Sequence, residues 1–210
     1  MNIGIIGAGN VSGALGKRWT ATGHNIKFGV RDANKPEVVA LLGKCGANAS
    51  AGSVAEAAAF GELIAIATPW PATRAAIESA GHLAGKIVID CTNPVKPDLS
   101  GLAIGHTASA AEQVASWAKG ARVLKCFNTT GANNMENPHY RGDRPVMFLC
   151  GDDADAKGVV MKLSQDVGFE MIDAGDLAIA RLLELVAMLW IHLAFRGGLG
   201  RDFAFKLLRR

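Results

Sequence analysis

The 210-residue sequence predicts an α/β fold, a Rossmann-type, doubly wound and mainly parallel sheet followed by C-terminal helices. Short apolar segments of strand length alternate with segments of helical spacing along almost the whole chain. The strand segments are apolar on both faces, as expected for a parallel sheet that helices cover on both sides. A glycine-rich turn directly follows the first of these strands.

The individual elements follow from the same patterns. Asn2–Ile6 is a short strand rich in isoleucine, and the helix expected over 10–22 places Val11, Leu15 and Trp19 on one face. Ser53 is a serine N-cap that begins a short helix over 53–59. Further strands are expected at 25–30, 63–67, 86–90, 122–127, 145–150 and 169–172, and further helices at 35–45, 72–80, 109–119, 154–167 and 177–195.

The composition and charge exclude several classes of protein. Half of the residues are hydrophobic, which rules out intrinsic disorder, and the 25 glycines have no three-residue period, which rules out a collagen-like chain. Residues 196–210 hold five basic residues and one acid, so they carry +4 and the rest of the chain carries −1. With only 6% aromatic residues as well, we expect no nucleic-acid partner. We interpret the basic end as a solvated helix end, with a membrane-surface or partner role as the alternative.

The cysteines and the apolar runs indicate a cytoplasmic protein. The cysteines are far apart, form no C-x-x-C pair and follow no signal peptide, so we expect free thiols rather than disulfides or a metal site. They are Cys45, Cys91, Cys126 and Cys150. The longest apolar run, 185–191, is far shorter than the roughly 18 residues that span a bilayer. The mostly apolar segment 177–195 contains charged residues, so we expect no transmembrane segment there but a buried or subunit-facing helix, and a homodimer.

The turn after the first strand carries most of the functional argument. It reads Gly7-Ala8-Gly9-Asn10-Val11-Ser12-Gly13, a G-x-G-x-x-S pattern between an isoleucine strand and a helix. Gly7 permits the tight turn, Gly9 lets the backbone approach a pyrophosphate, and the phosphates would lie on the amides of the following helix. Ser12 replaces the usual third glycine, is small enough for close packing, and could offer its hydroxyl to a phosphate. We therefore expect a dinucleotide-binding domain over 1–175 and a helical extension over 176–210, packed on it or at a dimer interface.

The end of the second strand favours NADP(H) over NAD(H). No carboxylate lies at the strand end itself, and Arg31 follows it, with Lys35 nearby. The arginine fork suits a 2′-phosphate, and the lysine would add a second positive charge. Asp32 is the counter-argument, because an acid in this region can instead accept from the ribose hydroxyls.

Polar clusters follow three later strands, at the edge where such sheets bind ligands. We expect them to line the nicotinamide and the second substrate. Trp70 could either stack on a ring or cap the core. The candidate residues are Thr68, Pro69, Trp70, Asn93, Pro94, Asn128 and Thr129. The last two begin a polar loop, 128–144, of a length that is often functional.

Segments along most of the sequence resemble those of a known enzyme family. The sequence is similar to the NADPH-dependent deazaflavin reductases, which exchange a hydride between NADP and coenzyme F420. It also resembles the cytosolic NADPH-binding domain of the STEAP metalloreductases. The matching segments are Gly7-Ala8-Gly9-Asn10, Phe28-Gly29-x-Arg31, Pro69-Trp70, Lys125-x-Phe127-Asn128-Thr129, Cys150-Gly151-Asp152-Asp153, Val159-Val160-Met161, Asp173-Ala174-Gly175, and Arg181 with Glu184. The resemblance implies a Rossmann domain with C-terminal helices, often a homodimer, with NADPH as donor and a flavin-like ring as acceptor.

The sequence departs from the family at two places. Val30 stands where the family often has a serine, so one expected 2′-phosphate contact is missing. Asn128-Thr129-Thr130-Gly131 stands where deazaflavin reductases typically carry His-Thr-x-Pro, which lines the deazaflavin. The acceptor therefore stays open among coenzyme F420, FMN, FAD and a small carbonyl compound.

Hydride transfer to a flavin-type ring requires positioning and the exclusion of water more than side-chain chemistry, so we name no catalytic acid or base. One alternative is reduction of a small carbonyl or imine, which usually needs a proton donor. Related hydroxyacid dehydrogenases carry a lysine on the long helix after the Rossmann domain, and 177–195 has none. Its candidate donors would be His106, His139, Tyr140 and His192. A second alternative is a non-catalytic sensor that binds NADPH.

Overall fold

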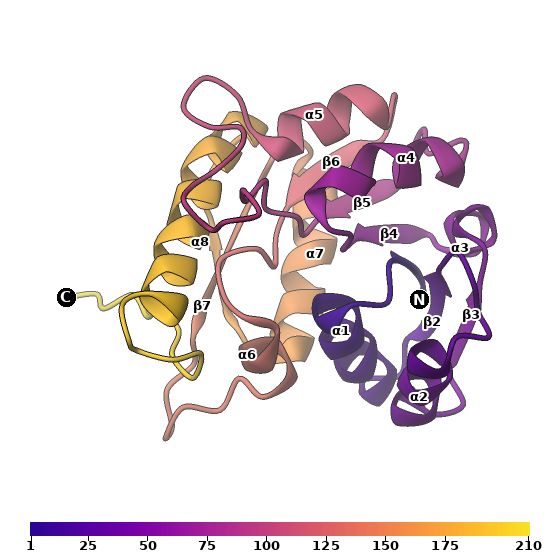
Figure 1. Cartoon of the computed structure of the whole chain (residues 1–210), viewed down its shortest axis with the longest axis horizontal. Coiled ribbons are helices and arrows are strands. Elements are labelled where there is room, and N and C mark those ends of the chain that lie inside the picture. The colour runs from indigo at the N-terminus through magenta and orange to yellow at the C-terminus, as the bar shows by residue number, and fades with distance from the viewer.

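The computed structural model describes residues 1–210 and contains one eight-stranded sheet, with strand order β3-β2-β1-β4-β5-β6-β7-β8 (Figure 1). Neighbouring strands are parallel except β6 and β7, which are antiparallel. The strands are β1 Asn2–Ile6, β2 Asn25–Gly29, β3 Ala49–Gly52, β4 Leu63–Ile66, β5 Ile87–Asp90, β6 Arg122–Lys125, β7 Val146–Gly151 and β8 Glu170–Asp173. The order of the first six strands is that of a Rossmann fold, so the predicted fold class is confirmed.

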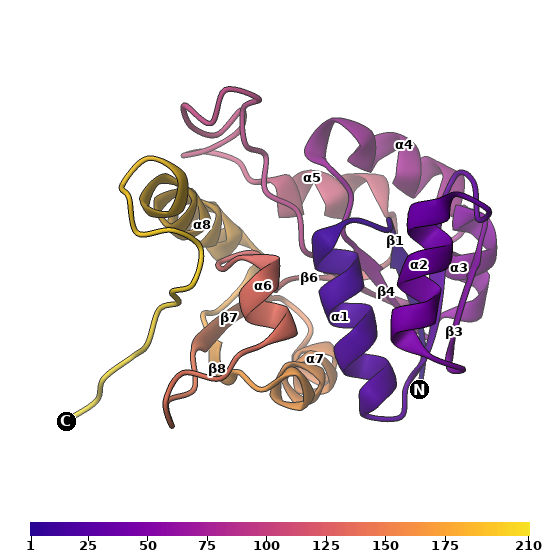
Figure 2. The same ribbon diagram turned by 60° about the horizontal axis from the view of Figure 1, so that its bottom comes forward.

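Helices cover both faces of the sheet (Figure 2). On one face lie α1 (Asn10–Ala21), α2 (Pro36–Cys45), α6 (Ala132–Glu136) and α7 (Ala154–Val167). On the other lie α3 (Val54–Phe60), α4 (Trp70–Ala80) and α5 (Ala110–Trp117), and α8 (Ala180–Phe195) packs beside α5. The short 3-10 helix η1, Leu177–Ile179, leads into α8.

The strand β1 shows why the buried strands are apolar throughout. Ile3 and Ile5 belong to the large core cluster beneath α1, α2 and α7, whereas Ile6 belongs to the cluster beneath α3, α4 and α5. Successive side chains of a strand point to opposite faces, so a strand covered on both sides needs apolar residues at every position. At Gly4 an added Cβ would lie 2.3 Å from the carbonyl oxygen of Ala57, which shows how closely α3 approaches the sheet.

Two elements differ from the sequence-based expectations. The edge strand β3 consists of alanine, serine and glycine, which carry no strand preference, and it forms by pairing with β2. The helix α6 lies inside the segment 128–144, which we expected to be a loop. The predicted N-cap at Ser53 is confirmed, because its hydroxyl accepts from the Glu56 amide; the Glu56 carboxylate also accepts from the Ser53 amide, which completes a capping box.

The C-terminal segment is not the solvated helix end that the sequence suggested. The helix α8 ends at Phe195, and the chain beyond it folds back on the domain. The Phe203 ring stacks on Trp190 with centroids 5.2 Å apart, and the Phe205 carbonyl accepts from the Val146 amide at 2.9 Å. Aromatic packing and backbone pairing therefore hold this segment, and its charges lie at exposed positions.

The segment from η1 through α8, Leu177–Phe195, is long and apolar enough to cross a membrane by length and composition alone. In the fold, Leu183, Ala187 and Trp190 are buried on its inner side. Its contacts with α5 and η1 make it part of the layer that covers the sheet.

Candidate functional site

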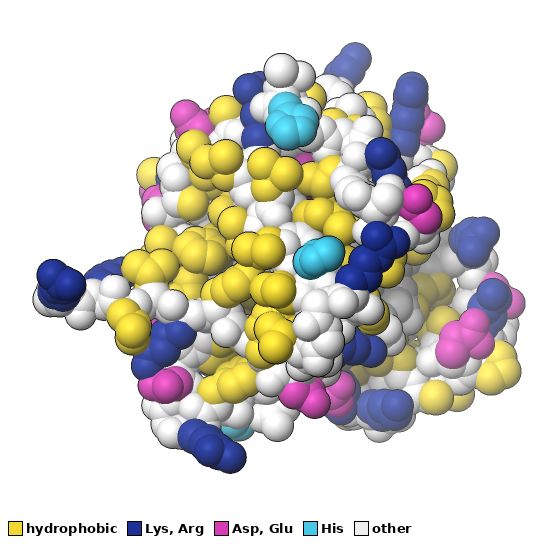
Figure 3. Space-filling model, turned by 60° about the vertical axis from the view of Figure 1, so that its left-hand side comes forward, with side chains coloured by type: hydrophobic (Ala, Val, Ile, Leu, Met, Phe, Trp, Pro, Cys, Tyr) yellow, Lys and Arg dark blue, Asp and Glu magenta, His cyan; other side chains and the backbone are white.

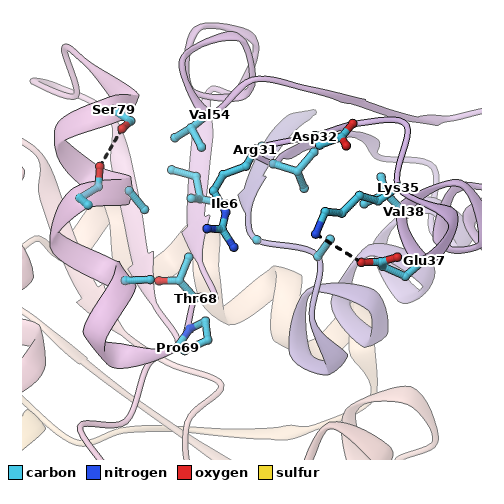
Figure 4. A pocket seen from close by; sticks show the side chains of 17 residues that line it. Ile6, Arg31, Asp32, Lys35, Glu37, Val38, Val54, Thr68, Pro69 and Ser79 are labelled. Atoms are coloured by element: carbon cyan, nitrogen blue, oxygen red, sulfur yellow. Dashed lines mark hydrogen bonds and ion pairs between the residues drawn. The ribbon is translucent and has the colours of Figure 1, made fainter.

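A cavity of about 420 Å³ opens at the carboxyl ends of β1, β2 and β4, between α2 and α4 (Figure 4). This is the point where the strand order reverses on either side of β1, and such switch points are where open α/β sheets bind ligands. The predicted residues that line it are Gly7, Ala8, Arg31, Lys35, Thr68 and Pro69. The remaining predicted residues lie outside its lining.

The glycine turn leaves room for a phosphate group. Gly7 has φ +113°, and a Cβ there would lie 2.8 Å from the carbonyl oxygen of Ala67, so a larger residue would be strained and crowded. Gly9 is the exposed N-cap of α1, no side chain caps this helix, and an added Cβ would meet nothing within 4 Å. The free amides of the first helical turn therefore face open space, as a bound pyrophosphate requires. The turn fits the phosphates of a dinucleotide.

The other residues of the turn take structural positions. Asn10 is exposed at the first position of α1, and Val11 packs against the large core cluster. Ser12 is fully buried, and its hydroxyl donates to the Ala67 carbonyl at 3.4 Å. Its small size permits the close helix–strand packing that we expected. The expectation that its hydroxyl meets a phosphate does not fit this geometry, because the hydroxyl points into the protein.

Positive charge lies at the β2 end of the cavity. Arg31 is exposed, and Figure 4 shows its guanidinium extending into the cavity. The Lys35 ammonium lies 3.8 Å from the Glu37 carboxylate, also at the cavity wall. Asp32 accepts a hydrogen bond from the Asn34 amide at 2.9 Å, so its carboxylate stabilises its own loop. A guanidinium and an ammonium group therefore lie beside the carboxyl end of β2, together with the carboxylates of Asp32 and Glu37.

The opposite wall is apolar and built from small side chains. The apolar lining consists of Ala72, Ala75 and Ala76 of α4, together with Val54 and Val38, and it suits a planar aromatic ring such as adenine. Thr68 is held in place by its hydroxyl, which lies 2.9 Å from that of Thr73.

Trp70 does not line this cavity. It begins α4, and its ring stacks on Trp117 of α5, with centroids 5.5 Å apart and an interplanar angle of 25°. Of the two roles that the sequence left open for it, the structure shows the packing role.

The residues that follow β5 and β6 form a second group beside the cavity. The Asn93 side chain donates to the Asn128 carbonyl at 2.8 Å, and the Asn128 side chain donates to Asn93 Oδ1 at 3.1 Å. Asn128 Oδ1 and Thr92 Oγ1 are buried without a hydrogen-bond partner. Pro94 is buried beside Asn93. The structure thus brings the two predicted asparagines together at the carboxyl edge of the sheet.

Thr129 differs from its predicted role. Its side chain is 1% exposed, and its hydroxyl donates to the sulfur of Met147 at 3.7 Å. The threonine therefore faces the core, and contact between its side chain and a ligand ring does not fit this position.

Sequence reasoning missed a buried ionic cluster at the same edge. Lys125, at the end of β6, is 0% exposed, and its ammonium lies 2.8 Å from Asp90 Oδ2 and 2.9 Å from Glu184 Oε1. Burial alone would lower the pKa of Lys125, but the two carboxylates raise it above its usual value, whereas burial raises the pKa of Glu184. The available signal was a lysine between apolar neighbours, Leu124 and Cys126, within the predicted strand 122–127.

The candidate proton donors for carbonyl or imine reduction lie outside the cavity. His106, His139 and His192 are exposed, and none of them lines it. The Tyr140 hydroxyl donates to Asn134 Oδ1 at 2.6 Å. The structure therefore brings no acid or base from this set to the cavity.

The sequence and the fold of this chain are similar to those of known NADP-dependent oxidoreductases. Residues 2–94 match the family model described as NADP oxidoreductase, coenzyme F420-dependent. A crystal structure of a protein from Arthrobacter sp. FB24, provisionally named an F420-dependent NADP reductase, superimposes with a TM-score of 0.89 and 32% identity, covering 99% of each chain.

Two curated relatives are each 29% identical to this chain. One is the metalloreductase STEAP3 of Rattus norvegicus, matched over 89% of this chain and 36% of its own length. The other is the F420-dependent NADP reductase of Methanocaldococcus jannaschii, matched over 66% of this chain and 64% of its own length. The chain thus spans less than two thirds of either curated relative. With the full-length structural match, these findings show that the chain belongs to the family of coenzyme F420-dependent NADP oxidoreductases.

Proposed function

We propose that this protein transfers a hydride between NADP(H) and a flavin-type acceptor, with the deazaflavin coenzyme F420 as the first candidate and FMN or FAD as the others. The observation that carries the proposal is the cavity at the switch point, where an uncapped glycine turn lies beside an exposed Arg31 guanidinium. Family membership supports the oxidoreductase class and the NADP cofactor. The names of the Arthrobacter and Methanocaldococcus proteins support the deazaflavin acceptor.

Different groups of residues would bind the different parts of the cofactor. The amides of the Gly7–Gly9 turn hold the pyrophosphate, Arg31 and Lys35 bind the 2′-phosphate, and the small side chains of α4 receive the adenine. The Asn93–Asn128 pair, with its unpartnered amide oxygen, borders the nicotinamide. When bound, NADP(H) supplies the hydride chemistry, and the protein supplies orientation and a water-poor surface.

This division requires no catalytic acid or base beside the nicotinamide. Reduction of a carbonyl or imine would need a proton donor. The helix α8 contains no lysine, and the Lys125 ammonium is buried between two carboxylates. The proposed reaction is therefore one that ring positioning alone can support.

The partner of this domain is proposed to be a second copy of the chain. Leu182, Leu185 and Leu189 of α8 are 57%, 39% and 50% exposed and share one face of the helix at i, i+3 and i+7. Figure 3 shows hydrophobic side chains gathered over this side of the molecule. We propose that residues 176–210 form the extension through which two copies pair, beside the cofactor domain of residues 1–175. The four buried free cysteines suit a reducing compartment, and we place the protein in the cytoplasm.

The experiment that tests the proposed function follows nicotinamide absorbance under anaerobic conditions, with coenzyme F420, FMN or FAD as acceptor. We expect NADPH oxidation that depends on one of these acceptors, with F420 the fastest and NADH a poor donor. Tight NADPH binding without oxidation by any flavin-type acceptor would overturn the proposal. It would favour carbonyl or imine reduction, or an NADPH-binding sensor.

A further inference from the structure

The buried cluster of Lys125, Asp90 and Glu184 is costly for the protein to keep. Taking a lysine and two carboxylates out of water has a large desolvation penalty, and their mutual attraction often does no more than offset it. All three side chains are at most 1% exposed. The large core clusters show that apolar residues could fill such a position, so the cluster needs an explanation other than stability.

Each member of the cluster fixes a segment next to Asn93 or Asn128. The Lys125 ammonium donates to the Thr92 carbonyl at 2.5 Å, and Asp90 Oδ1 accepts from the Thr92 amide at 2.9 Å. Both peptide groups of the residue before Asn93 are therefore held by charged side chains. Lys125 itself lies three residues before Asn128 in the chain.

Glu184 connects the cluster to two helices. Its carboxylate accepts from the amides of Ala110 and Ala111, at 3.0 and 3.3 Å, in the first turn of α5. On α8 the adjacent residue, Leu183, accepts a hydrogen bond from the Asn128 side chain through its carbonyl at 3.2 Å. Neighbouring residues of α8 therefore make both contacts: Glu184 joins α8 to α5, and Leu183 holds the side-chain amide of Asn128.

The backbone between Lys125 and Asn128 is strained. Phe127 has φ +57°, a conformation that costs a bulky residue energy, and it is fully buried with its ring edge-on to Trp19. The core packing of Phe127 and the ion pairs of Lys125 lie at this turn. Its consequence is that Asn128 faces Asn93 across the ends of β5 and β6.

We propose that Lys125, Asp90 and Glu184 are positioning residues that hold the Asn93–Asn128 pair as the binding surface for the nicotinamide half of NADP(H). This inference rests on the proposed function, since it places the nicotinamide at these asparagines. It assigns the adenosine half of the cofactor to the Arg31 cavity, which has no contact with the cluster. Disturbing the cluster should therefore weaken the binding of one half of the cofactor and leave the other unchanged.

The test compares two ligands by calorimetric titration of the full chain, NADPH and 2′-phospho-ADP-ribose, which lacks the nicotinamide. For Glu184→Gln we expect NADPH affinity to fall about tenfold, the equivalent of one lost buried hydrogen bond, and the affinity for 2′-phospho-ADP-ribose to change less than about twofold. The matched control is Glu112→Gln, because Glu112 on α5 also pairs with α8, through Arg181, but contacts neither asparagine. We expect that control to leave both affinities unchanged.

The inference would be overturned if Glu184→Gln lowered the affinity for both ligands equally, or if the Glu112→Gln control showed the same change. Either result would mean that the cluster only stabilises the packing of α8. No change in either affinity would overturn the inference as well. If Glu184→Gln does not fold, Asp90→Asn serves in its place, since its side-chain oxygen can still accept from the Thr92 amide. Because the readout is binding, a wild-type protein that binds NADPH but reduces no flavin would refute the proposed acceptor and leave this inference standing.

Discussion

At the scale of single residues, the structure separates predicted residues that line the cavity, such as Gly7 and Arg31, from predicted residues whose side chains face the core, such as Ser12 and Thr129. The positive φ of Gly7, the open N-cap at Gly9 and the place of Arg31 at the cavity were predictable, because they depend on backbone freedom and charge, which the sequence displays directly. Ser12 and Thr129 were not, because both hydroxyls point inward, and a sequence does not show the direction of a side chain.

Arg31 should determine the choice between NADPH and NADH. Replacing it by alanine removes a charge-assisted contact of about 1.5–3 kcal/mol, so we expect NADPH affinity to fall by roughly 10- to 100-fold while NADH affinity stays unchanged. Titration of both cofactors against Arg31→Ala measures this. A variant that loses affinity for both cofactors equally would show that Arg31 does not read the 2′-phosphate.

The two glycines of the turn should respond differently to the same substitution. Gly7→Ala meets the Ala67 carbonyl at a positive φ, so we expect a loss of stability of about 1–3 kcal/mol. Gly9→Ala meets nothing within 4 Å, so we expect an unchanged melting temperature and weaker NADPH binding, since the methyl group fills the space of the phosphates. Thermal melts and titrations separate the two effects, and a Gly9→Ala variant with wild-type affinity would contradict the placement of the pyrophosphate.

At the scale of elements, hydrophobic pattern and caps were enough for most of the fold. The N-cap at Ser53 and the apolar residues on both faces of β1 were readable in the sequence. The strand β3 was not, because its four small residues become a strand only through pairing with β2. The helix α6 is only five residues long, and its asparagines indicate a loop, so tertiary packing decides its conformation.

The junction between α5 and α8 should weaken in acid. The Arg181 hydrogen bond is the main cause that lowers the pKa of Glu112 below its ordinary 4.5. A lowered folded-state pKa means that the pair stabilises the fold above pH 4.5 and that this contribution is lost as the pH falls through the lowered value. We expect wild type to melt slightly above Glu112→Gln at neutral pH and the gap to close in acid. A gap that persists below the folded-state pKa would contradict this assignment.

At the scale of the whole molecule, the sequence predicted an α/β domain with an apolar final helix, and the structure shows which face of that helix stays uncovered. Leu183, Ala187 and Trp190 are buried, and the leucines at 182, 185 and 189 are exposed. The cluster of Lys125, Asp90 and Glu184 could not be predicted, because it joins side chains from β5, β6 and α8 that are far apart in the chain.

The exposed face of α8 should control the oligomeric state. We expect wild type to sediment as a dimer and Leu185→Glu as a monomer, because a buried charge at the centre of an apolar interface opposes pairing. Val39→Glu is the matched control, since Val39 is 56% exposed on α2, away from this face, and we expect it to remain a dimer. A monomeric wild type in analytical ultracentrifugation would refute the proposed partner.

The most direct test of the proposed function is the fate of a deuterium label. In two separate reactions the protein is incubated with coenzyme F420 and with NADPH deuterated at either the pro-R or the pro-S position of C4, in ordinary water. The reduced acceptor is then analysed by mass spectrometry. Because the accepting atom of a deazaflavin is a carbon, a hydride transferred directly keeps its label. We expect the deuterium to be retained in the reduced acceptor and to come from a single face of the nicotinamide. A reduced acceptor without deuterium in both reactions, or no reduced acceptor at all, would contradict direct hydride transfer between the two rings.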